Sequence, residues 1–309
     1  MNMLSDVLGA KEQNRDISEQ TQWIKESDIS SLIVSDALAQ YAFLAGISSA
    51  SSSSAFWLGY QLAIQYLFGD SLNGEIAAFV INENRSSNPA DWCTSLVKNQ
   101  DVNVLSGKKD FVTAKDQIDC LLVGGVLKDS EIDGKIKGLT RICKVIASEE
   151  GLNYQSFNGL PVFKELEKSR VTIEGVCVAD DSMLKGDGYS CYIKPFRLVE
   201  DFFVSVSLLG YLCRLIHGCS GSKKYWGKIS LLRALLPLCE ARLKVLKPDF
   251  SSYDLVIEGF LNEVAGFIAQ VVRENSGVDL FDSLSKDLMV LSIGEKARSI
   301  RYERALKQD

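Results

Sequence analysis

The chain has 309 residues, which suits one large domain or two to three small ones. Its 46% hydrophobic and 24% charged residues are ordinary for a packed globular protein, and a net charge of −6 offers no basic surface, so we expect no nucleic-acid partner. The eight cysteines form no Cys-x-x-Cys pair and His217 is the single histidine. We therefore expect no metal centre, and a Ser–His–Asp triad is disfavoured.

The N-terminus lacks the basic and apolar stretches of a signal peptide. The most hydrophobic window, residues 55–68, is shorter than a bilayer span of about 20 residues and contains Gln61 and Gln65. The missing signal peptide, the short apolar window and the eight cysteines, which form no Cys-x-x-Cys pair, together predict a cytoplasmic protein with no membrane partner.

Residues 1–72 are expected to be helical, because apolar residues recur at three- and four-residue intervals within 31–44. The serine-rich run 48–54 has the composition of a linker, but it also suits the start of a helix, since serine caps helices. We favour the helix start, because a flexible linker would leave two apolar segments uncovered.

From 73 to 183 the pattern changes to short apolar runs between Asn, Gly, Ser and Asp clusters, which predicts strands at 76–81, 118–125 and 171–178. We expect a turn at Ser106 and Gly107. Residues 136–149 fit either a helix or a pair of strands.

Helical patterns return after residue 184, at 198–215, 231–246, 255–272 and 284–306, with Pro248 ending the second and a solvated turn expected at 222–228. The sequence thus predicts an α+β protein with N-terminal helices (1–72), a small central β domain (73–183) and a C-terminal four-helix bundle (184–309).

One ordered set of motifs runs through the middle of the chain. Gly107-x-Lys109-x-Phe111-Val112-Thr113 is followed by the alternating strand at 171–178 and by a helix that carries Glu200. This order, between about residues 74 and 210, resembles the acyl-CoA dehydrogenase family of flavoproteins. The N-terminal helical portion is shorter than is usual in that family.

The resemblance implies an FAD cofactor and the α,β-dehydrogenation of an acyl thioester, carried by CoA or a carrier protein, in a homo- or hetero-oligomer. In the family an aromatic ring covers the flavin and a threonine hydroxyl lies near its N5, roles that fall on Phe111 and Thr113. Asn82 stands where the family has a threonine, Glu83 keeps the glutamate that follows, and Ser87 falls in the family's Gly-Ser-Asp turn. The alternative is that Phe111 and Thr113 are simply alternate residues of a half-buried strand.

The resemblance also offers two positions for a glutamate that removes a proton next to the thioester. Glu200, ten residues before Gly210, is our first choice, although Asp201 replaces the family's basic residue. Glu295 is the second choice, in an Ile-Gly-Glu-Lys run that resembles the family's Ile-Tyr-Glu-Gly. The alternatives are a first-turn acid beside Arg197 for Glu200, and a solvated surface residue for Glu295.

Other family features are missing. The Arg-x-x-Phe-Gly…Gln segment that grips the FAD pyrophosphate is replaced by residues 222–228, whose lysines, Lys223, Lys224 and Lys228, could act only as point charges. This opens an alternative function, a catalytically inactive homologue that acts as a binding or assembly subunit with an active relative. In that case we expect exposed apolar surface around Phe56, Trp57 and Tyr60 for a partner to cover.

Overall fold

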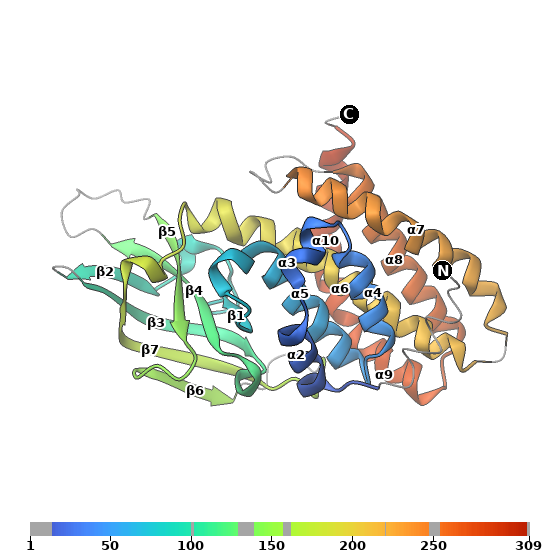
Figure 1. The fold of residues 1–309 in the computed structure, drawn as a ribbon, viewed down its shortest axis with the longest axis horizontal. Coiled ribbons are helices and arrows are strands. Elements are labelled where there is room, and N and C mark those ends of the chain that lie inside the picture. Colours follow the sequence, from blue (N-terminus) through green and yellow to red (C-terminus); the bar gives the residue numbers. More distant parts are fainter. Residues whose placement is uncertain are drawn as a thin grey trace. The chain divides into compact units, whose positions relative to one another are not determined.

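The computed structural model describes residues 14–99, 102–128, 139–156, 162–219, 221–246 and 254–307, with only the backbone described for 99, 290–294, 296 and 297 (Figure 1). The chain divides into two compact units. A helical unit takes the described parts of Met1–Tyr66, Pro161–Glu165 and Arg197–Asp309, and a sheet unit takes those of Leu67–Leu160 and Leu166–Phe196. The N-terminal and C-terminal helices therefore share one unit, whereas the prediction from the sequence placed them in separate domains.

The sheet unit is built on one curled sheet, whose strands are β1 (Ala77–Val80), β2 (Ser95–Asn99), β3 (Val102–Thr113), β4 (Cys120–Lys128), β5 (Thr140–Ile146), β6 (Leu152–Ser156) and β7 (Lys168–Val178) (Figure 1). The strand order is β1-β4-β2-β3-β7-β6, and β5 pairs with β4. β1 and β2 lie parallel to successive stretches of β4, while β5 lies antiparallel to it. Short 3-10 helices follow β1, β3 and β7: η1 (Pro89–Asp91), η2 (Lys115–Gln117) and η3 (Asp180–Ser182).

The three predicted strands correspond to β1, β4 and β7, and the open segment 136–149 contains the strand β5. The expected turn at Ser106 and Gly107 is wrong, because both residues lie inside β3. The pairing register with β7 shifts between Leu105 and Gly107, so a bulge, with Gly107 at φ 154°, takes the place of the turn. A side chain at Gly107 would collide with Thr94, which explains the glycine there.

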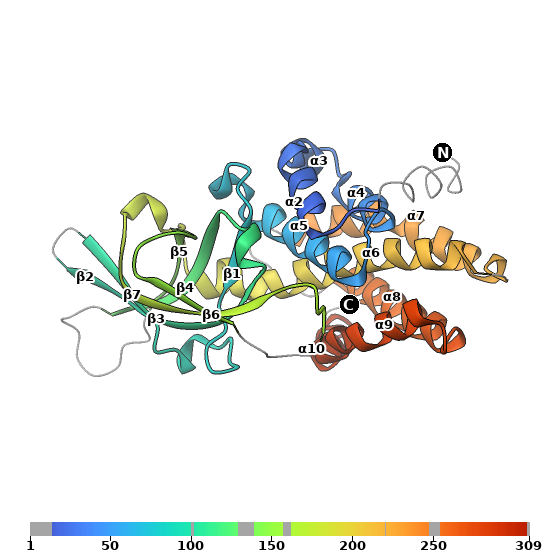
Figure 2. The ribbon, with the colours of Figure 1, turned by 90° about the horizontal axis from the view of Figure 1, so that it is seen from below.

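The helical unit holds α2 (Ile17–Glu26), α3 (Ile29–Val34), α4 (Leu38–Ile47), most of α5 (Ser52–Leu72), most of α6 (Lys194–His217), α7 (Lys223–Leu246), α8 (Leu255–Glu274), α9 (Asp279–Asp287) and α10 (Met289–Ala305). One π-helical turn, η4 (Tyr189–Ile193), leads into α6. α8, α9 and α10 pack against one another (Figure 2). The serine run does begin a helix, as predicted, but the single helix expected at 284–306 breaks at Leu288 into α9 and α10.

Glycines let three helices of this unit touch backbone to backbone. A Cβ added to Gly210 of α6 would collide with the carbonyl oxygen of Phe43 in α4, and one added to Gly46 would collide with the carbonyl oxygen of Ser207. A Cβ on Gly59 of α5 would lie 2.6 Å from the Cα of Val204 in α6. These crossings place α4 and α5 directly on α6, which is buried along most of its length.

A polar junction ties α4 to α7. Ala37 at the start of α4 provides no side-chain cap; instead the buried carboxylate of Glu240 in α7 accepts hydrogen bonds from the backbone N–H groups of Leu38 (3.0 Å) and Ala39 (2.8 Å). In return, Pro237 inside α7 leaves the carbonyl of Arg233 without its helical donor, and the Gln40 amide of α4 donates to that oxygen at 3.3 Å. Each helix thus satisfies a backbone defect of the other.

Two sequence expectations are corrected in this unit. Trp57 and Tyr60 are buried, and the Trp57 Nε1–H donates to the Thr21 hydroxyl at 2.9 Å, so they do not form an exposed apolar surface. Phe56, half-buried, stacks on Phe163. The aromatic side chains of α5 are needed to cover the unit's own core.

Residues 222–228 are not a solvated turn, because α7 begins at Lys223. Lys224 pairs with Glu274 at 2.6 Å and Lys228 pairs with Glu263, both in α8. These two lysines therefore hold α7 against α8 by ion pairs across the helix interface.

In the part of the chain that the structure describes, α8 is the one helix long and apolar enough to cross a membrane by length and composition. Half of its apolar window is buried, and the helix packs against α7 and α10. Its apolar face is accounted for by the core of the bundle.

Replacement of Gly210 by alanine tests the helix crossings. The added methyl has no space against the Phe43 carbonyl, so we expect the free energy of unfolding to fall by about 1–3 kcal/mol. Gly69→Ala in α5 is the matched control, because a Cβ added there would have no described atom within 4 Å, and we expect a neutral or slightly stabilising effect. Urea denaturation of both variants measures the difference; equal stabilities would contradict the backbone contact.

Candidate functional site

The residues predicted from the sequence divide between the two units. Asn82, Ser87, Phe111 and Thr113 belong to the sheet unit, whereas Glu200 and Glu295 belong to the helical unit. Each set is described within its own unit.

The structure brings Asn82 beside the end of β3. Asn82 follows β1, and its carbonyl oxygen accepts a hydrogen bond from the backbone N–H of Asp110 at 2.8 Å. Asn82 is thereby placed next to Phe111 and close to Thr113, the last residue of β3, and all three side chains are half-buried. Ser87, also half-buried, lies further along the same loop, after the tight turn from Glu83 to Ser86.

Phe111 has a strained backbone. Its φ of 63° lies in the left-handed region, which a bulky aromatic residue seldom adopts. The register of β3 against β7 shifts between Lys109 and Val112, so Phe111 sits in a bulge. Strain of this kind costs about 1–3 kcal/mol and persists only where neighbouring contacts hold it, often at functional sites.

One of those contacts is a buried ion pair that the sequence did not reveal. The Lys109 ammonium is fully buried, 3.2 Å from the Glu83 carboxylate and 3.5 Å from the ring centroid of Trp92. Burial lowers the pKa of Lys109 to about 8, and the nearby Glu83 opposes this effect. The pair connects the loop that carries Asn82 to β3, two residues before Phe111.

Glu83 is also held by the strand that follows it. Its carboxylate accepts hydrogen bonds from the Cys93 N–H (2.5 Å) and from the Thr94 N–H (3.2 Å) and hydroxyl (2.8 Å). Burial alone would raise the pKa of Glu83, but these donors and Lys109 lower it, so the group is a fixed anion. It acts as a structural anchor for the loop.

A second ion pair holds the bulge itself. The buried Asp110 carboxylate lies 2.6 Å from the guanidinium of Arg170 in β7. Asp110 and Lys109 are adjacent in β3 and both are buried, and each charge is neutralised by a partner of opposite sign. The Lys-Lys-Asp-Phe run contained these residues, but the sequence carried no sign that consecutive charges would both be buried.

Two side chains at this edge remain available to a ligand. Among the described residues, the amide of Asn82 and the hydroxyl of Thr113 have no hydrogen-bond partner. Phe111, whose ring is half-buried, lies two residues before Thr113 in β3, so the sheet edge offers an aromatic ring and two polar groups. This donor set fits a flat heteroaromatic ring system.

Glu200 lies in α6 of the helical unit and is half-buried. Burial, assisted by the negative charge of Asp201, raises the pKa of Glu200 to about 8. Asp201 is itself neutralised by ion pairs with Arg298 (3.5 Å) and Arg301 (2.6 Å) of α10. Two adjacent carboxylates thus have different roles: Asp201 ties helices together, and Glu200 is a carboxyl whose proton can be exchanged near neutral pH.

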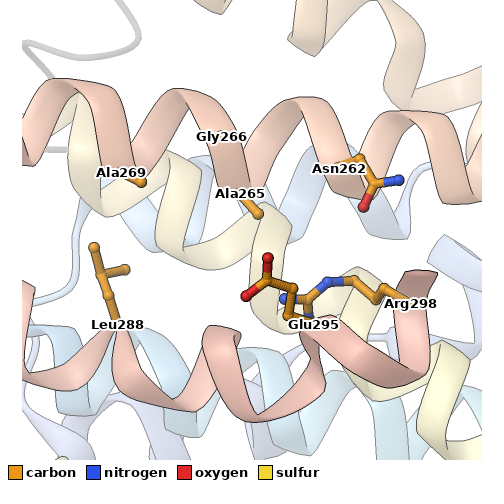
Figure 3. A pocket seen from close by; sticks show the side chains of 7 residues that line it. All are labelled: Asn262, Ala265, Gly266, Ala269, Leu288, Glu295 and Arg298. Carbon is orange, nitrogen blue, oxygen red and sulfur yellow. The ribbon is translucent and has the colours of Figure 1, made fainter.

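Glu295 lies on α10, is exposed, and lines a cavity of about 310 Å³ between α8 and α10. The other lining residues are Asn262, Ala265, Gly266, Ala269, Leu288 and Arg298. Figure 3 shows the Glu295 carboxylate reaching toward Ala265 of α8. Glu200 is not among the lining residues, so the two candidate bases do not share this cavity.

His217 is the last residue of α6, in agreement with a structural role at a helix end. In the described ranges, no group of three or more histidine, cysteine, aspartate or glutamate side chains is arranged to hold a metal ion.

Comparison with known proteins gives a result for the fold alone. No protein-family model and no curated protein matches the sequence. Among solved structures, the butyryl-CoA dehydrogenase of Megasphaera elsdenii matches with a TM-score of 0.65 and 13% identity, covering 100% of this chain and 99% of that one. FMN-bound TdsC from Paenibacillus sp. A11-2 has a TM-score of 0.69 and 12% identity, over 98% of this chain and 93% of that one.

A third match, XiaF from Streptomyces sp. in complex with FADH2 and glycerol, has a TM-score of 0.67 and 11% identity, over 99% of this chain and 92% of that one. Such low identities report shape and say nothing about chemistry. The predicted α+β architecture and the resemblance to the acyl-CoA dehydrogenase family are therefore confirmed for the fold: the chain has the fold of acyl-CoA dehydrogenase-like flavoproteins.

Proposed function

We propose that this protein is a flavin-dependent oxidoreductase of the acyl-CoA dehydrogenase type, which oxidises an acyl thioester carried by CoA or a carrier protein. The observation that supports it most is the strained Phe111, held by two ion pairs beside Asn82 and Thr113, whose side chains find no partner among the described residues, in a chain with a flavoprotein fold. Strained residues of this kind cluster at ligand-binding sites, where surrounding contacts hold them in place.

In this proposal Phe111 covers one face of a flavin, FAD by the resemblance, and Asn82 and Thr113 donate hydrogen bonds to its polar edge, with Ser87 nearby in the same loop. The bound flavin would accept the hydride from the β-carbon of the substrate.

Glu200 takes the proton from the carbon next to the thioester. A base with a pKa near 8 is matched to a weakly acidic carbon better than an ordinary carboxylate, because it binds the transferred proton more strongly. Glu295 is the second candidate, since its carboxylate lines a cavity large enough for a small organic group. The cytoplasmic location and the absence of membrane and nucleic-acid partners stay predictions from the sequence.

The alternative is an inactive homologue that serves as an assembly subunit. It is favoured by one specific observation, an exposed apolar face on α7 that includes Leu231, Leu238 and Val245. A well-folded protein that stays colourless and takes up neither FAD nor FMN would support this alternative and contradict the enzyme.

One prediction concerns flavin binding by Phe111. We expect the purified chain to show flavin absorption, or to bind added FAD, and Phe111→Ala to weaken that binding about tenfold, because a stacked ring contributes about 1.4 kcal/mol. Phe111→Tyr, which keeps the ring, is the control and should bind normally. Fluorescence titration with FAD and FMN measures both; equal affinity for all three proteins would remove Phe111 from the site.

The backbone strain at Phe111 can be tested without a flavin. Phe111→Gly and Phe111→Ala remove the same ring, but glycine accepts φ 63° freely, so we expect the glycine variant to be more stable than the alanine variant by about 1 kcal/mol. Thermal unfolding of the two variants compares them directly. If alanine were as stable as glycine, residue 111 would not be held in the left-handed region.

A further prediction uses the raised pKa of Glu200. Between the ordinary carboxyl pKa of 4.5 and about 8, the native state keeps a proton that the unfolded chain has released, so this group makes stability fall as pH rises through that window. We expect Glu200→Gln to flatten the dependence of the unfolding free energy on pH there, measured by urea denaturation. An unchanged profile would mean that Glu200 is not protonated in the native protein.

The same variant tests catalysis. If Glu200 is the base, the rate of flavin reduction by an acyl thioester should rise with pH up to about 8 and fall by at least a hundredfold in Glu200→Gln. Glu295→Gln, at the second candidate, should leave the rate within a few-fold of the wild type. Anaerobic stopped-flow spectroscopy gives both rates, and a reversed pattern would assign the base to Glu295.

A further inference from the structure

Four charged side chains from three helices meet next to Glu200 in the helical unit. Asp201 follows Glu200 in α6, and its carboxylate lies 2.6 Å from Arg301 and 3.5 Å from Arg298, both of α10. Arg301 also lies 2.5 Å from the carboxylate of Glu258 in α8. We call Asp201, Glu258, Arg298 and Arg301 the charge cluster; with two charges of each sign, it is neutral as a whole.

The charge cluster holds the Asp201 carboxylate in one place. Arg298 contacts its Oδ1 and Arg301 its Oδ2, so both oxygens are bound. Arg298 is buried, and Arg301 is fixed on its other side by the buried Glu258. A carboxylate bound in this way does not rotate into solvent, where water and salt would screen its charge. The negative charge of Asp201 therefore stays beside Glu200.

The other helices packed on α6 bring little further charge to this place. In α4 and in the part of α5 that belongs to the helical unit, all of which the structure describes, no side chain is acidic or basic. Their tyrosines, Tyr41, Tyr60 and Tyr66, are uncharged near neutral pH. Within α6, Arg197 lies one turn before Glu200 but is exposed to solvent. The charge cluster is thus the main source of a fixed electric field at Glu200.

We propose that Asp201 is a positioning residue for Glu200: the arginines of α10 fix the Asp201 carboxylate beside Glu200, where its negative charge keeps a proton on Glu200. This inference rests on the proposed function, in which Glu200 is the base, and it names the residue that tunes that base. Asp201 acts through Glu200 alone and needs no contact with substrate or flavin. Burial contributes most to the raised pKa of Glu200, and Asp201 adds to it.

Two changes in the charge cluster should act on Glu200 in opposite directions. Asp201→Asn removes a negative charge and leaves an excess positive charge on the cluster, which favours the ionised form of Glu200. Arg298→Gln removes a positive charge, while Arg301 still pairs with both remaining carboxylates, so the cluster becomes negative and favours the protonated form. A purely structural role of the cluster gives no reason for opposite signs.

The titration of Glu200 can be followed directly by carbon-13 NMR of the full chain labelled at the glutamate carboxyl carbons. The Glu200 signal is the one missing from Glu200→Gln. We expect Asp201→Asn to lower the midpoint of its titration by about one pH unit, and Arg298→Gln to raise it by about half a unit, because its ion pair with Asp201 is the longer one. Asp201→Glu, which keeps the charge, should titrate close to the wild type.

The matched control is Arg304→Gln. It removes an arginine from the same helix, α10, but this side chain is exposed and lies outside the charge cluster, so the midpoint of Glu200 should not change. Circular dichroism confirms that each variant is folded. If Asp201→Asn or Arg298→Gln does not fold, the direction of the shift in the other variant decides.

Shifts in opposite directions support the proposal. An unchanged midpoint in Asp201→Asn, a shift of both variants in the same direction, or an equal shift in Arg304→Gln would each overturn it. None of these measurements needs a bound flavin or activity.

The rate of flavin reduction by an acyl thioester separates this proposal from the proposed function. If Glu200 is the base, the pH at which this rate is half-maximal should follow the NMR midpoint in each variant. NMR midpoints that shift as expected while the rate profile stays unchanged would support the role of Asp201 and contradict only the role of Glu200 as the base.

Discussion

The reciprocal junction between α4 and α7 is the constraint on which the helical unit depends. Glu240 supplies the two acceptors that the first turn of α4 lacks, and Gln40 supplies the donor that Pro237 removes from α7. The partners are about two hundred residues apart in the chain, so neither helix end can be satisfied until the N-terminal and C-terminal segments meet. Burial raises the pKa of Glu240 while the bonds from Ala39 and Leu38 oppose that shift, which shows the cost of placing a carboxylate there. Without the carboxylate, the buried N–H groups at the start of α4 would have no acceptor, which would cost more free energy than burying Glu240.

The packing of α4, α5 and α6 depends on glycines, which have no side chain to keep the backbones apart. Gly46, Gly59 and Gly210 bring α4, α5 and α6 into backbone contact, leaving the aromatic residues of α5 to fill the remaining space. Trp57 and Tyr60 are therefore part of the core of the helical unit.

In the sheet unit, two ion pairs fix the backbone of β3 around Phe111. The pairs Glu83–Lys109 and Asp110–Arg170 hold the two residues of β3 that precede Phe111, at the bulge where Phe111 adopts a left-handed conformation. The arrangement separates the groups that fix the site from the groups that remain free to bind, since the side chains of Asn82 and Thr113 have no partner within the described ranges. In the helical unit Asp201 is tied to α10 by an ion pair, whereas burial raises the pKa of its neighbour Glu200.

The sequence by itself determined the elements whose cause is local. Apolar periodicity and serine capping predicted α5, α6 and α8, and strand patterns predicted β1, β4 and β7, because these depend on neighbours within one or two turns. The order of motifs around Phe111 predicted the fold that the comparisons confirm.

Only the tertiary structure decided the rest. Whether Ser106 and Gly107 turn or continue a strand depends on Thr94 across the sheet, and whether Lys109 is buried depends on Glu83 and Trp92. Burial of Trp57 and exposure of Leu238 could not be read from their identity, because both are apolar residues on apolar helices. Such outcomes are set by contacts between residues far apart in the chain. A pattern of neighbouring residues carries no information about those contacts.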